Sequence, residues 1–177
     1  ATMQWLRDGL KLFTHAKESE QLASSIDYEH GVIFVPAFTG LGAPYWDADA
    51  RGAILGLTRD AGITEIVSAA LQAVAFQTKD LQQAMAKDGV MPDIIRVDGG
   101  MSANNWLMQC LADMLRAKIE RPALLETTAL GVAYLAGLQV GLFTSLEQIS
   151  ALWQVQQTFE PKLDEQQVNA LYQQWQQ

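Results

Sequence analysis

The chain has 177 residues and a mass of 19.5 kDa, which is the size of one domain. Hydrophobic residues make up 49% and charged residues 18%, a balance that excludes both a disordered polymer and a membrane bundle. The net charge of −8 excludes a basic footprint for nucleic acid or for an anionic bilayer. With Cys110 as its single cysteine, the chain forms no internal disulfide, and we expect a cytoplasmic protein.

Neither a membrane span nor a metal site is predicted. The longest apolar run, from Ala129 to Phe143, is shorter than the roughly 20 residues that a span requires, and we interpret it as a buried helix. Cys110, His15 and His30 lack the spacing of metal ligands. The chain opens directly on a helix-like segment with Ala1 in place of Met, so we expect a part of a longer protein.

In the first half of the chain the residue pattern changes at residue 31, from helical spacing to short β-rich runs. Helical spacing predicts a helix over 3–13 and a weaker one over 18–26. Short β-rich runs at 32–35 and 53–57 then predict two strands around a long irregular loop. Thr64 can cap a long helix that ends near Lys87, and we expect this helix to be central. Its predicted apolar face comprises Ile63, Val67, Ala70, Leu71, Val74, Thr78, Leu81 and Met85.

The second half predicts a strand, helix, strand unit. A strand over 94–97 runs into a turn, a helix starts at Ser102, and a second, parallel strand covers 118–121. Further helices are expected from Thr127 or Thr128 to Gly141, over 146–153, and from Asp164 to the end. In this last helix Val168, Leu171, Tyr172 and Trp175 form one packing stripe. The fold class is therefore α/β, a single domain over 1–177 with a small mixed sheet flanked by helices.

The turn Asp98-Gly99-Gly100 after the first of these parallel strands is the strongest candidate site. Two adjacent glycines allow a sharp bend and close approach of a ligand to the main chain, and the next helix offers unpaired N–H groups. A nucleotide could rest there. A tight structural turn is the alternative, and the spacing matches neither the P-loop nor the dinucleotide fingerprint.

A second candidate is the loop Gly40-Leu-Gly-Ala-Pro-Tyr-Trp-Asp47. Its small residues, proline and two aromatic residues are typical of a rigid binding loop. We favour the other interpretation, in which Tyr45 and Trp46 anchor the loop to the core. Cys110, on an apolar helix face, is expected to behave as a small hydrophobe.

These segments together resemble the FGGY carbohydrate kinase family. Every position of the family's C-terminal signature is present, and its elements here are Gly52-Ala-Ile-Leu-Gly-Leu57, Glu65-Ile66 and Ala69-Ala-Leu-Gln72. The likeness covers about Thr2 to Phe143. Three segments resemble the branch of the family that phosphorylates glycerol more than the branches that act on xylulose, ribulose or gluconate. They are the 40–47 loop, the Arg96–Gln109 segment and the Glu120–Gly131 segment.

The resemblance implies the C-terminal lobe of an actin-like ATPase with a ribonuclease-H-like core, in which ATP lies between two lobes. It implies that Gly100 and Asn104 contact the adenosine end of the nucleotide, that Gly99 shapes the turn, and that Gln4 contacts it from the first helix. Family members transfer the γ-phosphoryl group of magnesium-ATP to a primary alcohol, and intact relatives commonly form dimers or tetramers.

The resemblance also identifies what this chain lacks. The family's catalytic aspartate lies in a Gly-Asp-Gln stretch, and the sequence contains no such stretch, so no residue here is predicted to be catalytic. The acceptor residues and the initial β-hairpin of the domain also lie outside it. We therefore expect the 177 residues alone to be inactive and the shortened sheet to have an unpaired edge. The alternatives are another FGGY kinase and a non-catalytic module with the same fold.

Overall fold

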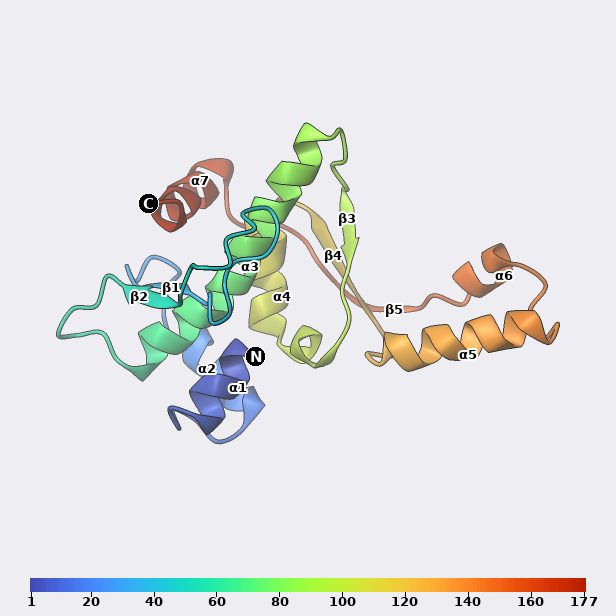
Figure 1. Cartoon of the computed structure of the whole chain (residues 1–177), viewed down its shortest axis with the longest axis horizontal. Coiled ribbons are helices and arrows are strands. Elements are labelled where there is room, and N and C mark those ends of the chain that lie inside the picture. Colours follow the sequence, from blue (N-terminus) through green and yellow to red (C-terminus); the bar gives the residue numbers. More distant parts are fainter.

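Helix α3 (Ile63–Lys87) is the centre of the computed structural model, which describes all 177 residues. Helices α1 (Thr2–Asp8), α2 (Ala16–Ser24) and α4 (Asn105–Leu115) pack against it or against one another, as Figure 1 shows. Helix α7 (Glu165–Trp175) returns the C-terminal end of the chain to this body. The prediction of a central helix over this segment is confirmed.

The buried face of α3 is only partly the predicted one. Val67 and Leu71 are buried as expected, whereas Leu81 and Met85 are 41% and 38% exposed. In their place Lys79 and Gln82 are buried, because their side chains donate to the last carbonyl groups of α4. The Lys79 Nζ to Met114 O distance is 2.7 Å, and the Gln82 Nε2 to Leu115 O distance is 3.0 Å. These bonds satisfy orphan carbonyl groups at a helix C-terminus, which apolar side chains cannot do.

The cap of α3 is also different from the predicted one. The helix begins at Ile63, with Gly62 and not Thr64 at the N-cap position. The Glu65 carboxylate accepts a hydrogen bond from the Gly62 N–H at 2.8 Å, so the acidic residue of the first turn, rather than a hydroxyl, satisfies this end of the helix.

Two small sheets flank this helical body. Strands β1 (Ile33–Val35) and β2 (Ala53–Leu55) form an antiparallel pair. In the second sheet the order is β3 (Ile94–Arg96), β4 (Lys118–Pro122) and β5 (Val155–Phe159), with β3 parallel and β5 antiparallel to β4. The parallel strand, helix, strand unit is confirmed, and β3 has a partner on one side only.

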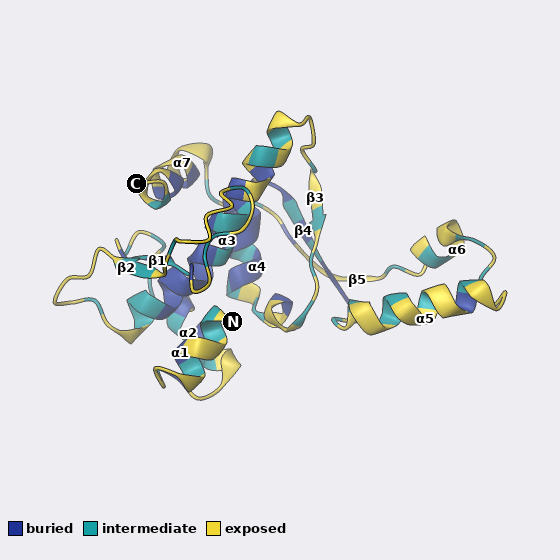
Figure 2. Cartoon of the chain, viewed as in Figure 1, coloured by how far each residue is buried: buried dark blue, intermediate teal, exposed yellow.

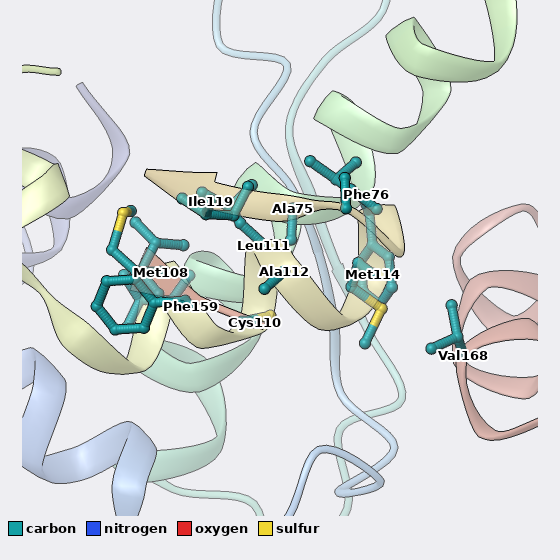
Figure 3. Close-up of a cluster of buried hydrophobic side chains, with 14 of the residues drawn as sticks. Ala75, Phe76, Met108, Cys110, Leu111, Ala112, Met114, Ile119, Phe159 and Val168 are labelled. Atoms are coloured by element: carbon teal, nitrogen blue, oxygen red, sulfur yellow. The ribbon is translucent and has the colours of Figure 1, made fainter. Parts of the chain in front are cut away.

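The main core lies between α3, α4, β4 and α7. Figure 3 shows Phe76 of α3, Leu111 and Met114 of α4, and Ile119 of β4 in this cluster, which Val168 joins from α7. Cys110 is fully buried in it, so its prediction as a small hydrophobe is confirmed. Phe76 also stacks on Trp175, with ring centroids 5.3 Å apart, and three of the four stripe residues of α7 are buried.

The first helix is shorter than predicted. It ends at Asp8, and Gly9 follows, where an added Cβ would lie 2.9 Å from the carbonyl oxygen of Trp5. Leu10 is consequently 44% exposed, whereas Phe13 is buried from a loop rather than from the helix.

Helix α5 (Thr127–Gln139) forms as predicted, but it is not buried. Figure 2 shows that it is mostly exposed, and Gly137 is its only buried residue. Its hydrophobicity is nearly uniform around the helix axis, so sequence patterning could not show which face would be covered. With the short helix α6 (Leu146–Ser150), it extends away from the main body in Figure 1. No helix in the structure combines the length and apolar character that crossing a membrane requires.

The interpretation of Tyr45 and Trp46 as anchors is wrong. Their side chains are exposed, and Trp46 retains 79% of its accessible surface. The 40–47 loop is closed instead by its own backbone, in which the Leu41 N–H donates to the Asp47 carbonyl at 2.7 Å. The loop is therefore closed without burial of its two aromatic side chains.

Candidate functional site

A pocket of about 710 Å³ lies between the N-terminal helices and the diglycine turn. This volume is in the range that small-molecule sites occupy. Three of the four residues predicted to bind a ligand line it, namely Gln4, Gly100 and Asn104. The other lining residues are Met3, Arg7, Phe13, Ala16, Lys17, Ser19, Glu20, Leu71, Met101, Ala103 and Asn105. The lining combines apolar surface that suits a flat ring with polar groups at several points.

The diglycine turn is shaped by Gly99 and opened by Gly100. Gly99 has φ +79°, a left-handed conformation that a side chain strains, and its N–H donates to the Leu125 carbonyl at 3.1 Å. Gly100 does not have a left-handed φ, and an added Cβ there would meet nothing within 4 Å. Gly99 does not line the pocket itself.

The helix expected to open at Ser102 begins three residues later. Residues Gly100–Ala103 form a single 3-10 turn, in which the Ser102 hydroxyl donates to the Gly99 carbonyl at 2.6 Å. Helix α4 then starts at Asn105, and Asn104 is its N-cap. Of this turn, Gly100, Met101 and Ala103 line the pocket, whereas Ser102 is buried behind it.

Asn104 therefore also has a structural role, which the sequence pattern did not predict. Its Oδ1 accepts a hydrogen bond from the Leu107 N–H at 2.8 Å, which caps α4. The Nδ2 group is not used by this cap. An N-terminal cap and a pocket-facing amide donor can thus coexist on one side chain.

The opposite wall comes from α1 and α2. Glu20 of α2 accepts a hydrogen bond from the Asn105 N–H at 3.1 Å through Oε1, and so joins α2 to the start of α4. Arg7 forms a bidentate contact with Asp8, at 2.7 and 3.0 Å, which lowers the pKa of the Asp8 carboxyl below its ordinary value. Lys17 forms no ion pair and is the remaining cation of the pocket.

The residues of α2 are the part of the site that sequence reasoning missed. Lys17, Ser19 and Glu20 lie in a weakly amphipathic segment with no motif around them. Only the packing of α2 against α3 and α4 brings them to the pocket. The one local signal was the regular spacing that predicted a helix over 18–26.

No group of three or more His, Cys, Asp or Glu side chains in the structure could hold a metal ion. The residues present therefore do not form a magnesium site by themselves, and we assign no step to the metal on this chain.

Comparison with known proteins identifies the family. Residues 1–140 match the FGGY family of carbohydrate kinases, C-terminal domain. A glycerol kinase of Alteromonas mediterranea is 59% identical over 175 residues, which is 99% of this chain and 35% of the relative. A glycerol kinase of Ectopseudomonas mendocina is 59% identical over 176 residues, or 99% of this chain and 36% of the relative. The chain thus spans about a third of the length of these relatives.

Solved structures agree with this assignment. A Plasmodium falciparum glycerol kinase determined with ADP superposes with a TM-score of 0.86 at 36% identity, over 97% of this chain and 34% of its own. A ligand-bound xylulose kinase of Lactobacillus acidophilus gives 0.84 at 25% identity, over 98% and 36%. The predicted fold class, a mixed α/β lobe of the actin-like ATPase type, is confirmed. The chain therefore belongs to the FGGY family of carbohydrate kinases, as its C-terminal domain.

Proposed function

We propose that this chain is the nucleotide-binding lobe of a glycerol kinase. In the intact protein it would bind ATP in the pocket between α1, α2 and the diglycine turn. The γ-phosphoryl group would pass to glycerol and give sn-glycerol 3-phosphate. The observation that carries the proposal is the convergence of Gln4, Gly100 and Asn104, from two distant segments, on one pocket of suitable volume.

The choice of glycerol rests on the degree of similarity. Two relatives described as glycerol kinases are 59% identical to this chain, whereas the xylulose kinase of known structure is 25% identical. Because acceptor-binding residues are expected outside this chain, the other FGGY kinases form the second candidate class. Assays of the intact protein with glycerol, xylulose and gluconate separate them, and preference for glycerol supports the proposal.

The lobe would act by holding the nucleotide in place. Phosphoryl transfer depends mainly on alignment of donor and acceptor and on charge neutralisation. The helix α4 N-terminus contributes a partial positive charge beside the pocket, while Met3, Leu71 and Met101 offer apolar surface to a base. Bound magnesium would neutralise phosphate charge, and closure of a second lobe would exclude water.

Substitution of Gly100 tests the pocket directly. Because a Cβ at Gly100 meets no atom of the chain, Gly100→Ala and Gly100→Val should fold normally and place their atoms in the pocket. We expect Gly100→Val to weaken ADP binding about tenfold or more, since overpacking costs about 1–3 kcal/mol, with Gly100→Ala intermediate. Isothermal titration calorimetry on the intact protein measures this.

Gly42→Val is the matched control, because a Cβ at Gly42 also meets nothing within 4 Å and Gly42 lies outside this pocket. It should leave ADP affinity unchanged. Equal ADP binding by wild type and Gly100→Val would reject the pocket. Kinase activity in the purified 177-residue chain would reject the assignment of the catalytic aspartate to residues outside it.

The remaining parts of the proposal concern the setting of the intact enzyme. We propose a cytoplasmic kinase that uses magnesium-ATP and works as a homodimer or homotetramer, with residues 1–177 acting as one domain. The low cysteine content and the family membership support this setting. Light scattering on the intact protein measures its oligomeric state, and a monomer would contradict that part.

A further inference from the structure

Arg121 is a buried cation that sits directly behind the pocket wall. It lies in β4, and only 7% of its surface is exposed. No carboxylate pairs with it, although burial of a guanidinium is costly unless its donors are satisfied. An unpaired buried arginine therefore needs an explanation from the groups that it contacts.

All of its hydrogen-bond partners are neutral acceptors, and they fall into two sets, while the guanidinium also lies over the Phe159 ring. On the pocket side, one terminal nitrogen donates to the Ser102 carbonyl at 3.0 Å and to Asn105 Oδ1 at 2.8 Å. On the sheet side, Nε donates to Gln156 Oε1 at 3.1 Å and the other terminal nitrogen to Gln157 Oε1 at 2.5 Å. The guanidinium is planar and has several donors in fixed directions, so it can bond to the pocket-side and the sheet-side acceptors at the same time.

The pocket-side contacts of Arg121 are to Ser102 in the 3-10 turn and to Asn105 at the start of α4. Ser102 closes the 3-10 turn through its bond to the Gly99 carbonyl, and Asn105 is the first residue of α4. The segment that follows β4 adds a third tie, because the Leu125 carbonyl accepts from the Gly99 N–H. The turn is therefore held from behind by β4 and its continuation, while its front faces the pocket.

We propose that Arg121 is a positioning residue for the nucleotide. It fixes the 3-10 turn and the start of α4 against the sheet, so that Gly100 and Asn104 keep the geometry that the ligand requires. The proposal rests on the proposed nucleotide-binding function of this pocket. Arg121 acts through these residues and does not line the pocket itself.

The test uses Arg121→Lys and Arg121→Met in the intact kinase. Lysine keeps the charge but has one compact donor group, which cannot reach both sets of acceptors in the same fixed geometry. We expect KM for ATP to rise about tenfold in Arg121→Met and about threefold in Arg121→Lys, since each loses charge-assisted hydrogen bonds that hold the wall. KM for glycerol should change less than twofold in both.

Lys79→Met is the matched control. Lys79 is also a buried cation, 8% exposed, and its amine donates to a carbonyl at the opposite end of the same helix, that of Met114. It should lower the melting temperature without changing KM for ATP. This separates a selective effect on the pocket from general loss of stability.

The outcomes are distinct. A selective rise of KM for ATP in the Arg121 variants, absent from Lys79→Met, supports the inference. Wild-type KM for ATP in Arg121→Lys, or equal effects of Arg121 and Lys79 variants at equal melting temperature, would overturn it. If Arg121→Met does not fold, Arg121→Lys decides alone. Failure of the wild-type protein to bind any nucleotide would instead reject the proposed function.

Discussion

Asn104 offers a way to separate the stability of the turn from its binding role. Its Oδ1 caps α4 at 2.8 Å from the Leu107 N–H, while its amide nitrogen is free of that bond. Asn104→Ala removes both groups, so it should destabilise the fold by about 1 kcal/mol through loss of the cap. For a domain of this size that corresponds to a decrease in Tm of about 2–4 °C.

Asn104→Ser is the informative variant. Serine at the N-cap also accepts from the helix N–H groups, so we expect the wild-type Tm within about 1 °C. It lacks the amide donor, however, and loss of one hydrogen bond to the ligand should weaken ADP binding about threefold to tenfold. Asn104→Ala should show the same weakening together with the lower Tm.

Thermal unfolding monitored with and without ADP, together with calorimetric titration, measures both quantities in the intact protein. If Asn104→Ser binds ADP as tightly as wild type, Asn104 is a helix cap and has no direct contact with the nucleotide. If Asn104→Ala keeps the wild-type Tm, the cap adds nothing to stability and the reasoning from its geometry is wrong.

Three further predictions concern a buried carboxylate, a buried thiol and a half-buried imidazole. Asp80→Ala should cost about 2 kcal/mol in urea unfolding, because it leaves the Trp175 indole N–H without its acceptor and the Tyr172 hydroxyl with only Gln83 Oε1; an unchanged midpoint would contradict this. Burial raises the pKa of the Cys110 thiol, so a thiol reagent should label it only after denaturation, and rapid labelling of the folded chain would be inconsistent with the core. Burial lowers the pKa of His30, so its neutral form is favoured in the fold; stability should fall as the pH drops below about 6.5, and His30→Gln should remove that component of the pH profile.

The sequence predicted the parts of the fold that local patterns specify. The strand, diglycine turn and helix around Gly99 were identified because glycine pairs and a change of hydrophobic period are visible in a short window. The closing helix was identified because the stripe ending at Trp175 has regular spacing. These signals depend on near neighbours in the chain.

The parts that failed depend on distant contacts. Strand β5 was missed because most of its side chains are exposed and only Phe159 is buried, so the segment lacks the apolar alternation of a half-buried strand. Helix α5 was assigned to the interior because it is apolar on all sides, yet burial depends on which segments lie beside it. The prediction that Trp46 anchors its loop was wrong for the same reason. An aromatic ring shows that burial would be favourable, but not whether another segment lies close enough to cover it.

The same consideration explains why the diglycine wall of the pocket could be predicted from local pattern, whereas on the opposite wall only Gln4 was predicted, through the family resemblance. One wall is a continuous segment, whose glycines and cap determine its shape. The other wall depends on Glu20, whose Oε1 is committed to the Asn105 N–H. This hydrogen bond joins α2 to α4 and therefore also holds the two pocket walls together. The same interaction thus serves both the fold and the site. Substitutions at Glu20 and Asn104, which line the pocket, and at Arg121, which holds the pocket wall from behind, should therefore alter the pocket directly.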